Sequence, residues 1–379
     1  MPLKNTRVLD LTRLLPGPYC SMLLADFGAE VIKIEDPKMG DYARHYEPKL
    51  DEDSTLFHSL NRNKKSVCLN LKSEDGKADF LEIVAKADVV VESFRPGVME
   101  RLGLDYEKLK NVNPGLVYCA ITGYGQTGPY ANKPGHDINY LSYAGLLNLM
   151  GEKEGRPVIP ATQIADIGGG AFPAALGILL ALMEREKSGE GQFVDISMLD
   201  GVISWLQTAL PNYLSHNTTV NRGEQMLAGG LAAYAVYETK DGRFLSVGAL
   251  EPKFWEAFCL AIERSDFIPL LEAPLQEQYR LNYEIQTIIS EKTLSEWLSI
   301  FSDIEACVTP VLSFEEMTED PQVIARGMIQ TVKHVTLGET KQISTPIKLS
   351  KTPGDIRSHA PKLGEHTTEF MKEMGILKK

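Results

Sequence analysis

Several features that would point to particular protein classes are scarce in this sequence. Only five of its 379 residues are cysteine: Cys20, Cys68, Cys119, Cys259 and Cys307. They are odd in number and widely scattered, so we expect reduced core residues and neither a disulfide framework nor a zinc site. Basic side chains are outnumbered, 39 against 51 acidic ones, and the net charge of -12 argues against a nucleic acid partner. A local basic patch for a small anionic ligand remains compatible with that charge.

The sequence also lacks a long uninterrupted apolar run. The longest, residues 167–183, contains three consecutive glycines and a proline and is shorter than the ~20 residues of a membrane span. A buried helix is therefore predicted there. The first six residues lead straight into a predicted strand and do not resemble a signal peptide. We expect a cytoplasmic protein with no membrane partner.

What the sequence does contain is a regular alternation of strand-like and helix-like segments. The short strand-like runs lie at residues 7–11, 30–35, 66–71, 88–92 and 116–121. Strands that alternate with helices predict an α/β fold with an open, doubly wound, Rossmann-like parallel sheet. No G-x-G-x-x-G motif follows the first strand, which disfavours dinucleotide binding. Residues 37–60 are polar and predict a loop.

The length of the chain predicts two domains, because one compact core seldom holds this many residues. We place a large α/β domain at residues 1–200 and a helix with a polar linker at 201–224. A smaller α+β domain follows at 225–320, where Asp241-Gly242 is a hairpin turn signal. The C-terminal segment, 321–379, is expected to return to the large domain.

One stretch, GYGQTGPYANKPGHDINYLSYAG at residues 123–145, joins a strand end to a helix start through a glycine-rich turn. His136 and Asp137 lie at the mouth of this turn, where open α/β sheets place ligands. Asp137 is equally suited to cap the helix predicted over residues 138–150. The pair is therefore a candidate site with a purely structural alternative.

Two further carboxylates are candidates. Asp166 precedes Gly168, Gly169 and Gly170 at the predicted start of the apolar helix, where it is either an N-cap or a functional group. The glycines would let a ligand approach the backbone and leave N–H groups free for a developing oxyanion. Glu251 lies at a strand end before Pro252, a position that also suits a capping carboxylate.

The sequence resembles the α-methylacyl-CoA racemases, which belong to the family III CoA-transferase superfamily. The resemblance rests on Gly135-His-Asp-Ile-Asn-Tyr140 behind Gly123-Tyr-Gly-Gln-Thr-Gly-Pro129, on Ser188-Gly-Glu-Gly-Gln192 and on Asp195-Ile-Ser-Met-Leu-Asp-Gly201. It extends over nearly the whole chain. It implies that His136 and Asp166 face each other across the substrate, with Glu251 and Asp137 beside the histidine.

The resemblance also implies coenzyme A as part of the substrate, with no metal and no separate cofactor. The residues it places in contact with CoA are Leu71, Lys72, Phe94, Arg95, Pro96, Gly97, Arg101, Gly135, Asn139 and Tyr140. Family members form interlocked homodimers, so Glu251 is expected to meet either His136 of its own chain or His136 of the partner subunit. Three basic segments could contact the CoA phosphates: Arg62 with Lys64 and Lys65, then Lys72, then Arg95 with Arg101. The alternative is that these side chains are ordinary solvated surface charges.

The predicted reaction is epimerisation of the α-carbon of a 2-methyl-branched acyl-CoA, with proton transfer between His136 and Asp166 through an enolate. One departure from the racemase pattern is Asp36, where racemases tend to be basic. The glycine loop of formyl-CoA transferase is not evident, Ala228-Gly-Gly230 being the nearest segment, and its absence favours the racemase. A CoA-transferase in which Asp166 forms an aspartyl-CoA intermediate is the first alternative. A non-catalytic acyl-CoA-binding protein is the second.

Overall fold

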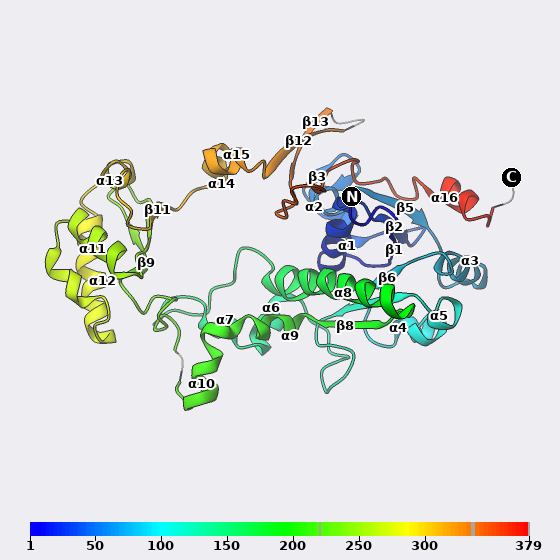
Figure 1. Cartoon of the computed structure of the whole chain (residues 1–379), viewed down its shortest axis with the longest axis horizontal. Coiled ribbons are helices and arrows are strands. Elements are labelled where there is room, and N and C mark those ends of the chain that lie inside the picture. Colours follow the sequence, from blue (N-terminus) through cyan, green and yellow to red (C-terminus); the bar gives the residue numbers. More distant parts are fainter. Residues whose placement is uncertain (220, 335–337, 378–379) are drawn as a thin grey trace. The chain divides into compact units, whose positions relative to one another are not determined.

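The computed structural model describes residues 1–219, 221–334 and 338–377, which divide into two compact units (Figure 1). The first unit consists of Met1–Ala144, Pro160–Trp205 and Pro321–Lys379, and the second of Gly145–Ile159 and Leu206–Asp320. Each unit has its own hydrophobic core. Residue 220, in the helix and linker predicted at 201–224, and residues 335–337, in the predicted C-terminal segment, lie outside the described residues.

A six-stranded parallel sheet forms the centre of the first unit. Its order is β5-β2-β1-β6-β7-β8, from β1 (Arg7–Asp10), β2 (Glu30–Glu35), β5 (Lys64–Cys68), β6 (Val89–Glu92), β7 (Val117–Thr122) and β8 (Phe193–Ser197). Counted along the chain this is the order 3-2-1-4-5-6 of doubly wound folds, so the predicted fold class is confirmed. The strand order reverses between β1 and β6, which places a crevice at their carboxyl ends.

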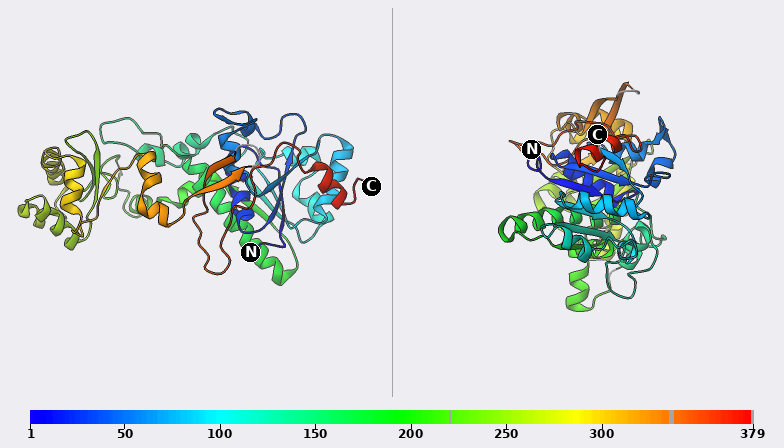
Figure 2. Two further views of the ribbon diagram at one scale, coloured as in Figure 1. Left: turned by 90° about the horizontal axis from the view of Figure 1, so that it is seen from above. Right: turned by 90° about the vertical axis from the view of Figure 1, so that its right-hand side faces the viewer.

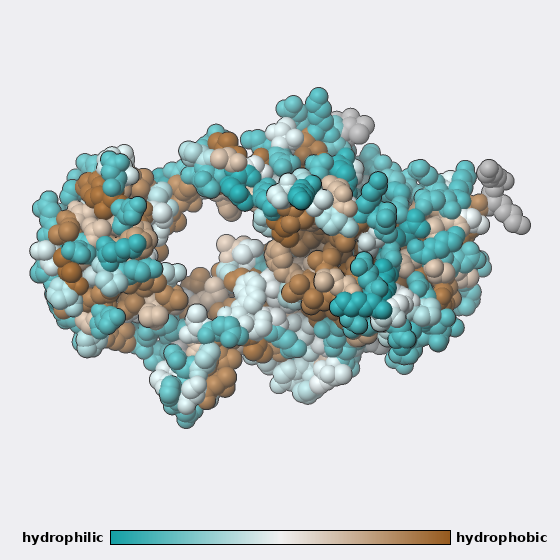
Figure 3. Space-filling model, in the orientation of Figure 1, coloured by the Kyte–Doolittle hydropathy of each residue, from teal (hydrophilic) through white to brown (hydrophobic). Residues whose placement is uncertain are grey.

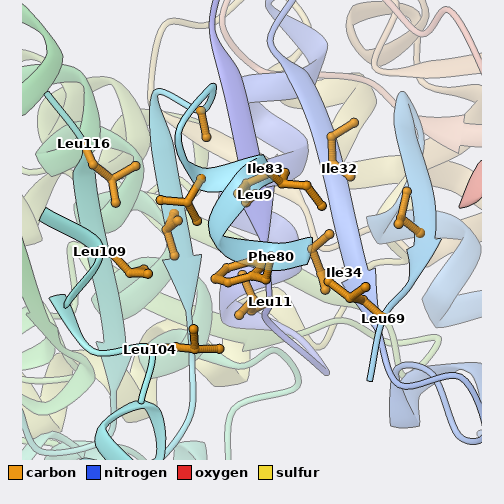
Figure 4. Close-up of a cluster of buried hydrophobic side chains, with 14 of the residues drawn as sticks. Leu9, Leu11, Ile32, Ile34, Leu69, Phe80, Ile83, Leu104, Leu109 and Leu116 are labelled. Carbon is orange, nitrogen blue, oxygen red and sulfur yellow. The ribbon is translucent and has the colours of Figure 1, made fainter. Parts of the chain in front are cut away.

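Helices cover both faces of this sheet. On one face, Leu9, Leu11, Ile32 and Ile34 pack against Phe80 and the rest of a core that α3 helps to build (Figure 4). On the other face, Ser21 of α1 donates a hydrogen bond to Asp10 of β1. Besides α2, η1 and η2, whose bounds are given below, the helices of the first unit are α1 (Pro16–Asp26), α3 (Glu74–Val84), α4 (Val98–Leu102), α5 (Tyr106–Val112), α6 (Asp137–Tyr143), α8 (Phe172–Ser188), α9 (Met198–Ser204), α15 (Pro321–Ala325) and α16 (Thr367–Glu373).

The C-terminal segment belongs to the first unit. It includes the hairpin strands β12 (Ile329–His334) and β13 (Gly338–Ile343), and then α16. Phe370, Met371 and Met374 enter the core of the sheet, and Ser66 of β5 accepts a backbone hydrogen bond from His366. Both ends of the chain therefore lie in the same unit (Figure 2).

Residues 37–60 are not the loop that their polar composition predicts. They contain η1 (Tyr42–His45), β3 (Lys49–Leu50), β4 (Asp53–Ser54) and α2 (Thr55–Leu60). The Arg44 guanidinium is buried and forms ion pairs of 2.7 Å with both Glu35 and Asp53. These buried ion pairs help to hold the polar segment in a defined structure.

The apolar run predicted as a buried helix is buried on one side only. Ala174, Ala175, Ile178 and Ala181 of α8 face the core, but Leu176, Leu180 and Met183 are 59%, 57% and 61% exposed. Apolar side chains gather on the face of the first unit around α1 and α8 (Figure 3). Within the described residues one helix, Ala165–Ser188, is long and apolar enough to cross a membrane, a test that core helices also pass.

The second unit is built on a three-stranded antiparallel sheet of order β11-β10-β9, from β9 (Tyr234–Glu238), β10 (Phe244–Gly248) and β11 (Val308–Pro310). Trp255, Phe258 and Trp297 fill its core. Its helices are α7 (Leu146–Leu149), η3 (Leu206–Thr208), α10 (Leu210–His216), α11 (Pro252–Ala261), η4 (Ser265–Leu270), α12 (Leu275–Ile289), α13 (Leu294–Phe301) and α14 (Phe314–Glu319).

The structure differs from the sequence predictions in one helix and in one cysteine. The helix predicted over 138–150 is interrupted at Gly145, whose φ of +80° ends α6 before α7 begins. All five cysteines are free, but Cys307 is exposed with a φ of +52° and is not a core residue. Cys20, Cys119 and Cys259 are buried as expected.

Candidate active site

A crevice lies where the strand order reverses. It encloses about 340 Å³ and is lined by residues that follow β1, β2, β5 and β6, at the carboxyl edge of the sheet. Among them are three of the predicted CoA contacts, Leu71, Lys72 and Phe94. Ligands of open α/β sheets bind at this topological position, so the crevice is the candidate nucleotide-binding site of the chain.

A second hollow, of about 570 Å³, lies on the other side of the turn from Phe94 to Gly97. Its lining includes the predicted contacts Arg95, Pro96 and Gly97, and also Glu92 and Tyr118. Gly97 has a φ of +79° and is the N-cap of α4, which carries Arg101 in its last turn. The structure therefore gathers the predicted residues 71–101 around a single turn.

The basic side chains fall into two groups. Arg62 pairs with Asp26 at 2.7 Å and Lys64 with Asp10 at 3.1 Å, both inside the core, and Lys65 pairs with Glu30. In the described part of the chain, no ion pair joins Lys72, Arg95 or Arg101, and all three are exposed. The side chains of the first basic segment therefore form ion pairs that stabilise the fold. Lys72, Arg95 and Arg101 remain candidates for contact with the CoA phosphates.

Sequence reasoning missed Arg13 in the crevice. Its guanidinium lies over the rings of Tyr42 and Phe94, 4.9 and 5.4 Å from their centroids, and it donates a 2.9 Å hydrogen bond to the Tyr42 hydroxyl. The available signal was positional, because Arg13 follows the strand at which the sheet order reverses.

His136 is the N-cap residue of α6, and its side chain is exposed. Its backbone N–H donates to Asn139 Oδ1 at 3.0 Å, and the Tyr140 hydroxyl donates to the Gly135 carbonyl at 2.6 Å. A Cβ atom at Gly135 would lie 2.7 Å from the Tyr140 ring. The three residues predicted to touch CoA here, Gly135, Asn139 and Tyr140, hold the histidine turn in place; their contact with CoA stays a prediction.

Asp137 does not cap its own helix through its side chain. Its Oδ1 accepts hydrogen bonds from the backbone N–H groups of Ala165 and Asp166, at 2.7 and 3.0 Å. These groups open the π-helix η2 (Ala165–Ala171) that leads into α8. Burial raises the pKa of Asp137, and the two N–H donors oppose that rise. Asp137 therefore ties the histidine turn to the helix of Asp166.

Asp166 lies in the first turn of η2 with its carboxyl group largely buried. Burial, together with the negative charge of Asp137, raises its pKa to about 7. A carboxyl group with that pKa is present in both protonation states near neutrality, so it can donate or accept a proton. π-Helical segments of this kind are frequent at functional sites.

The three glycines after Asp166 have a packing role. A Cβ atom would lie 1.9 Å from the Trp205 ring at Gly168, 2.6 Å from the Met198 carbonyl oxygen at Gly169, and 2.8 Å from Met198 Cγ at Gly170. Packing against α9 and Trp205 therefore accounts for these glycines, and approach of a ligand to their backbone stays a prediction. The N–H groups of Ala165 and Asp166 are also occupied, so these two are unavailable to an oxyanion.

Gly169→Ala is expected to lower the free energy of unfolding by about 1–3 kcal/mol, because the new methyl group overlaps a backbone oxygen that cannot move alone. Gly168→Ala is the matched control: its Cβ meets the Trp205 ring, which is 54% exposed and can swing away. Urea unfolding of both variants measures the difference. A Gly168 variant less stable than the Gly169 variant would contradict this account.

Glu251 belongs to the second unit, whereas His136, Asp137 and Asp166 share the first. It is the N-cap residue of α11, where its backbone carbonyl accepts from Phe254 and Trp255 and its exposed side chain makes no capping hydrogen bond. The Glu251 carboxylate therefore does not cap α11, which was the structural alternative to a functional role. Among the described residues no cluster of His, Cys, Asp and Glu has the arrangement of a metal site.

Comparison with known proteins gives consistent matches along the chain. The profile of a family described as CoA-transferase family III matches residues 3–367. The α-methylacyl-CoA racemase of Homo sapiens is 35% identical, over 99% of this chain and 94% of its own. The succinyl-CoA:glutarate CoA-transferase of Mus musculus is 33% identical, over 98% and 86%. A solved CAIB/BAIF family protein from Brucella suis superposes with a TM-score of 0.86 at 29% identity, over 99% of both chains.

Proposed function

Since this chain belongs to CoA-transferase family III, whose transferases and racemases act on acyl-CoA thioesters, we propose that it epimerises the α-carbon of a 2-methyl-branched acyl-CoA. The observation that carries the proposal is the site in the first unit. There Asp137 links the exposed His136 to the helix of Asp166, a largely buried carboxyl group whose pKa is about 7.

The CoA moiety would bind at the carboxyl edge of the sheet. The crevice offers Arg13, Lys72 and Phe94, and the adjoining turn offers Arg95. Exposed cations attract phosphate groups, and Phe94 offers an apolar surface. No cofactor is needed beyond the CoA of the substrate.

The α-proton of a thioester is weakly acidic, so its removal needs a base on one face and stabilisation of the enolate oxygen. Inversion then needs an acid on the opposite face. Asp166 and His136 would fill these roles, each acting as base in one direction. Because Asp137 occupies the first N–H groups of η2, the enolate oxygen has to find other donors.

Glu251 would orient the imidazole and stabilise its charged form. In a homodimer this carboxylate could reach His136 of the partner subunit. Support for a dimer comes from the exposed side of α8, where Leu176, Leu180 and Met183 are apolar. Dimerisation remains part of the proposal.

A CoA-transferase is the alternative function. The same Asp166 would attack the acyl-CoA carbonyl, expel the CoA thiolate and form a mixed anhydride. The thiolate would then attack the aspartyl carbonyl, release the donor carboxylate and leave an aspartyl-CoA thioester. The observation that favours it is the 33% identity to a succinyl-CoA:glutarate CoA-transferase, only slightly below that to the racemase.

The deciding experiment is incubation with a 2-methylacyl-CoA of one configuration in deuterated water. A racemase incorporates deuterium at the α-carbon and produces the other epimer. A transferase does neither, but hydroxylamine added with the donor CoA ester traps its acylated aspartate and inactivates it. Trapping without exchange would reject the racemase and leave the CoA site in place.

Arg95→Ala is expected to weaken binding of free CoA about tenfold, since Arg95 is an exposed cation with no ion pair among the described residues. Lys65→Ala is the matched control, because Lys65 is paired with Glu30 at 2.7 Å. Calorimetry should show the Arg95 effect shrinking as salt is added. Equal affinities of the two variants would exclude Arg95 from the phosphate site.

A further inference from the structure

Among the described residues of the first unit, one buried carboxyl group has no ion-pair partner and no part in the proposed mechanism. Among the described residues five carboxyl side chains are buried, and four of them form ion pairs with Lys64, Arg62, Arg44 and Lys33. The fifth, Glu92, is 5% exposed and has no basic partner within ion-pair distance. Burial raises its pKa to about 7. A buried carboxyl group without a cation is costly for the fold and is typical of functional sites.

The position of Glu92 shows which part of the chain its carboxyl group holds. It ends β6 at the carboxyl edge of the sheet, after Val89–Val91, and lines the 570 Å³ hollow together with Arg95. Its Oε2 accepts a short hydrogen bond of 2.6 Å from the backbone N–H of Phe94. Its Oε1 lies 3.4 Å from the Tyr118 hydroxyl, a much weaker contact. The strongest contact of this carboxyl group is therefore with the turn that separates the two hollows.

The same turn presents the residues that face CoA. Phe94 lies in the crevice, where the Arg13 guanidinium is 5.4 Å from its ring centroid, and Arg95 extends on the other side. The Arg95 carbonyl accepts from Val98 at 3.1 Å, which closes the turn onto α4. Loss of the Glu92 acceptor would release the first N–H of this turn.

We propose that Glu92 is a positioning residue for CoA, because it fixes the turn from Phe94 to Gly97 in the conformation that presents Phe94 and Arg95 to the ligand. This inference rests on the proposed CoA site but on neither reaction, since a racemase and a transferase bind CoA alike. A fourth apolar residue after Val89–Val91 would extend the core without an uncompensated carboxyl group. The Glu92 carboxyl group is therefore present at the expense of the stability of the fold.

Glu92→Met distinguishes a role of Glu92 in CoA binding from a role in the stability of the fold. It should leave the urea midpoint unchanged or raised, and weaken binding of free CoA about tenfold in calorimetry, because the turn loses its acceptor. Glu92→Gln keeps an acceptor oxygen of similar reach and should bind within about threefold of the wild type. In turnover assays KM for the acyl-CoA should rise in the Met variant while kcat stays within about twofold.

Tyr118→Phe is the matched control, because it removes only the 3.4 Å contact, and it should bind CoA like the wild type. Wild-type affinity in Glu92→Met would overturn this inference alone. So would failure of Glu92→Met to fold, since the carboxyl group would then serve the fold. Absence of CoA binding by the wild type would instead overturn the proposed function, and this inference with it.

Discussion

Replacing Asp166 with asparagine should lower the rate of α-carbon epimerisation by about 10²–10⁴-fold, the usual contribution of a general acid or base. The amide keeps the shape of the carboxyl group but cannot take or give the proton. His136→Ala should lose epimerisation to a similar degree, because inversion needs a group on each face. Either single variant should retain slow deuterium exchange with retention of configuration. The measurement is NMR of the α-hydrogen, combined with separation of the two epimers.

The transferase gives a different pattern for the same variants. Asp166→Asn would abolish transfer and hydroxylamine trapping, whereas His136→Ala would retain most of the activity. Free CoA should bind all variants within about twofold, which controls for misfolding. Full epimerisation by His136→Ala would refute the two-base assignment.

Replacing Lys64 with methionine should lower the free energy of unfolding by about 3 kcal/mol. The substitution leaves Asp10, which is fully buried, without its 3.1 Å partner. Breaking a buried ion pair in this way typically costs about 3–5 kcal/mol. We expect the lower end of that range because the positive charge of Lys33 also acts on Asp10 and lowers its pKa. Urea unfolding measures the change.

The double variant Asp10→Leu with Lys64→Met tests the origin of that loss. Replacing both charges by apolar groups of similar volume should restore most of the stability, because no uncompensated carboxylate remains. A double variant as unstable as the single one would show that packing, and not the buried charge, is responsible.

Apolar periodicity made much of the fold predictable from the sequence. The strand predicted at 30–35 is β2 residue for residue, and the strand predicted at 88–92 is β6 with one residue added. Hydrophobic alternation is a local property, so it is visible without knowing the partner strand. The strand-to-helix turn likewise indicated that His136 lies just before a helix, and it is the N-cap residue of α6.

Long-range partners could not be predicted. Lys64 looked like a phosphate ligand, but its partner Asp10 lies 54 residues earlier. The glycines after Asp166 looked like a ligand cradle, but the atoms that need their space belong to α9. Glu92 ends the strand predicted at 88–92, and only the structure shows that no basic side chain among the described residues lies within ion-pair distance of it. In each case the sequence showed the type of residue, but its role depends on partners that tertiary packing brings close.

The return of residues 321–379 to the first unit bears on how the chain folds during synthesis. The core of that unit is completed by Phe370, Met371 and Met374, which leave the ribosome after the whole of the second unit. Most of the second unit, residues 206–320, emerges earlier and is nearly continuous in sequence. It can therefore fold on the nascent chain while the large sheet still exposes apolar surface around β5. The first unit is therefore completed after the second, and until then its unfinished face is an aggregation-prone apolar surface.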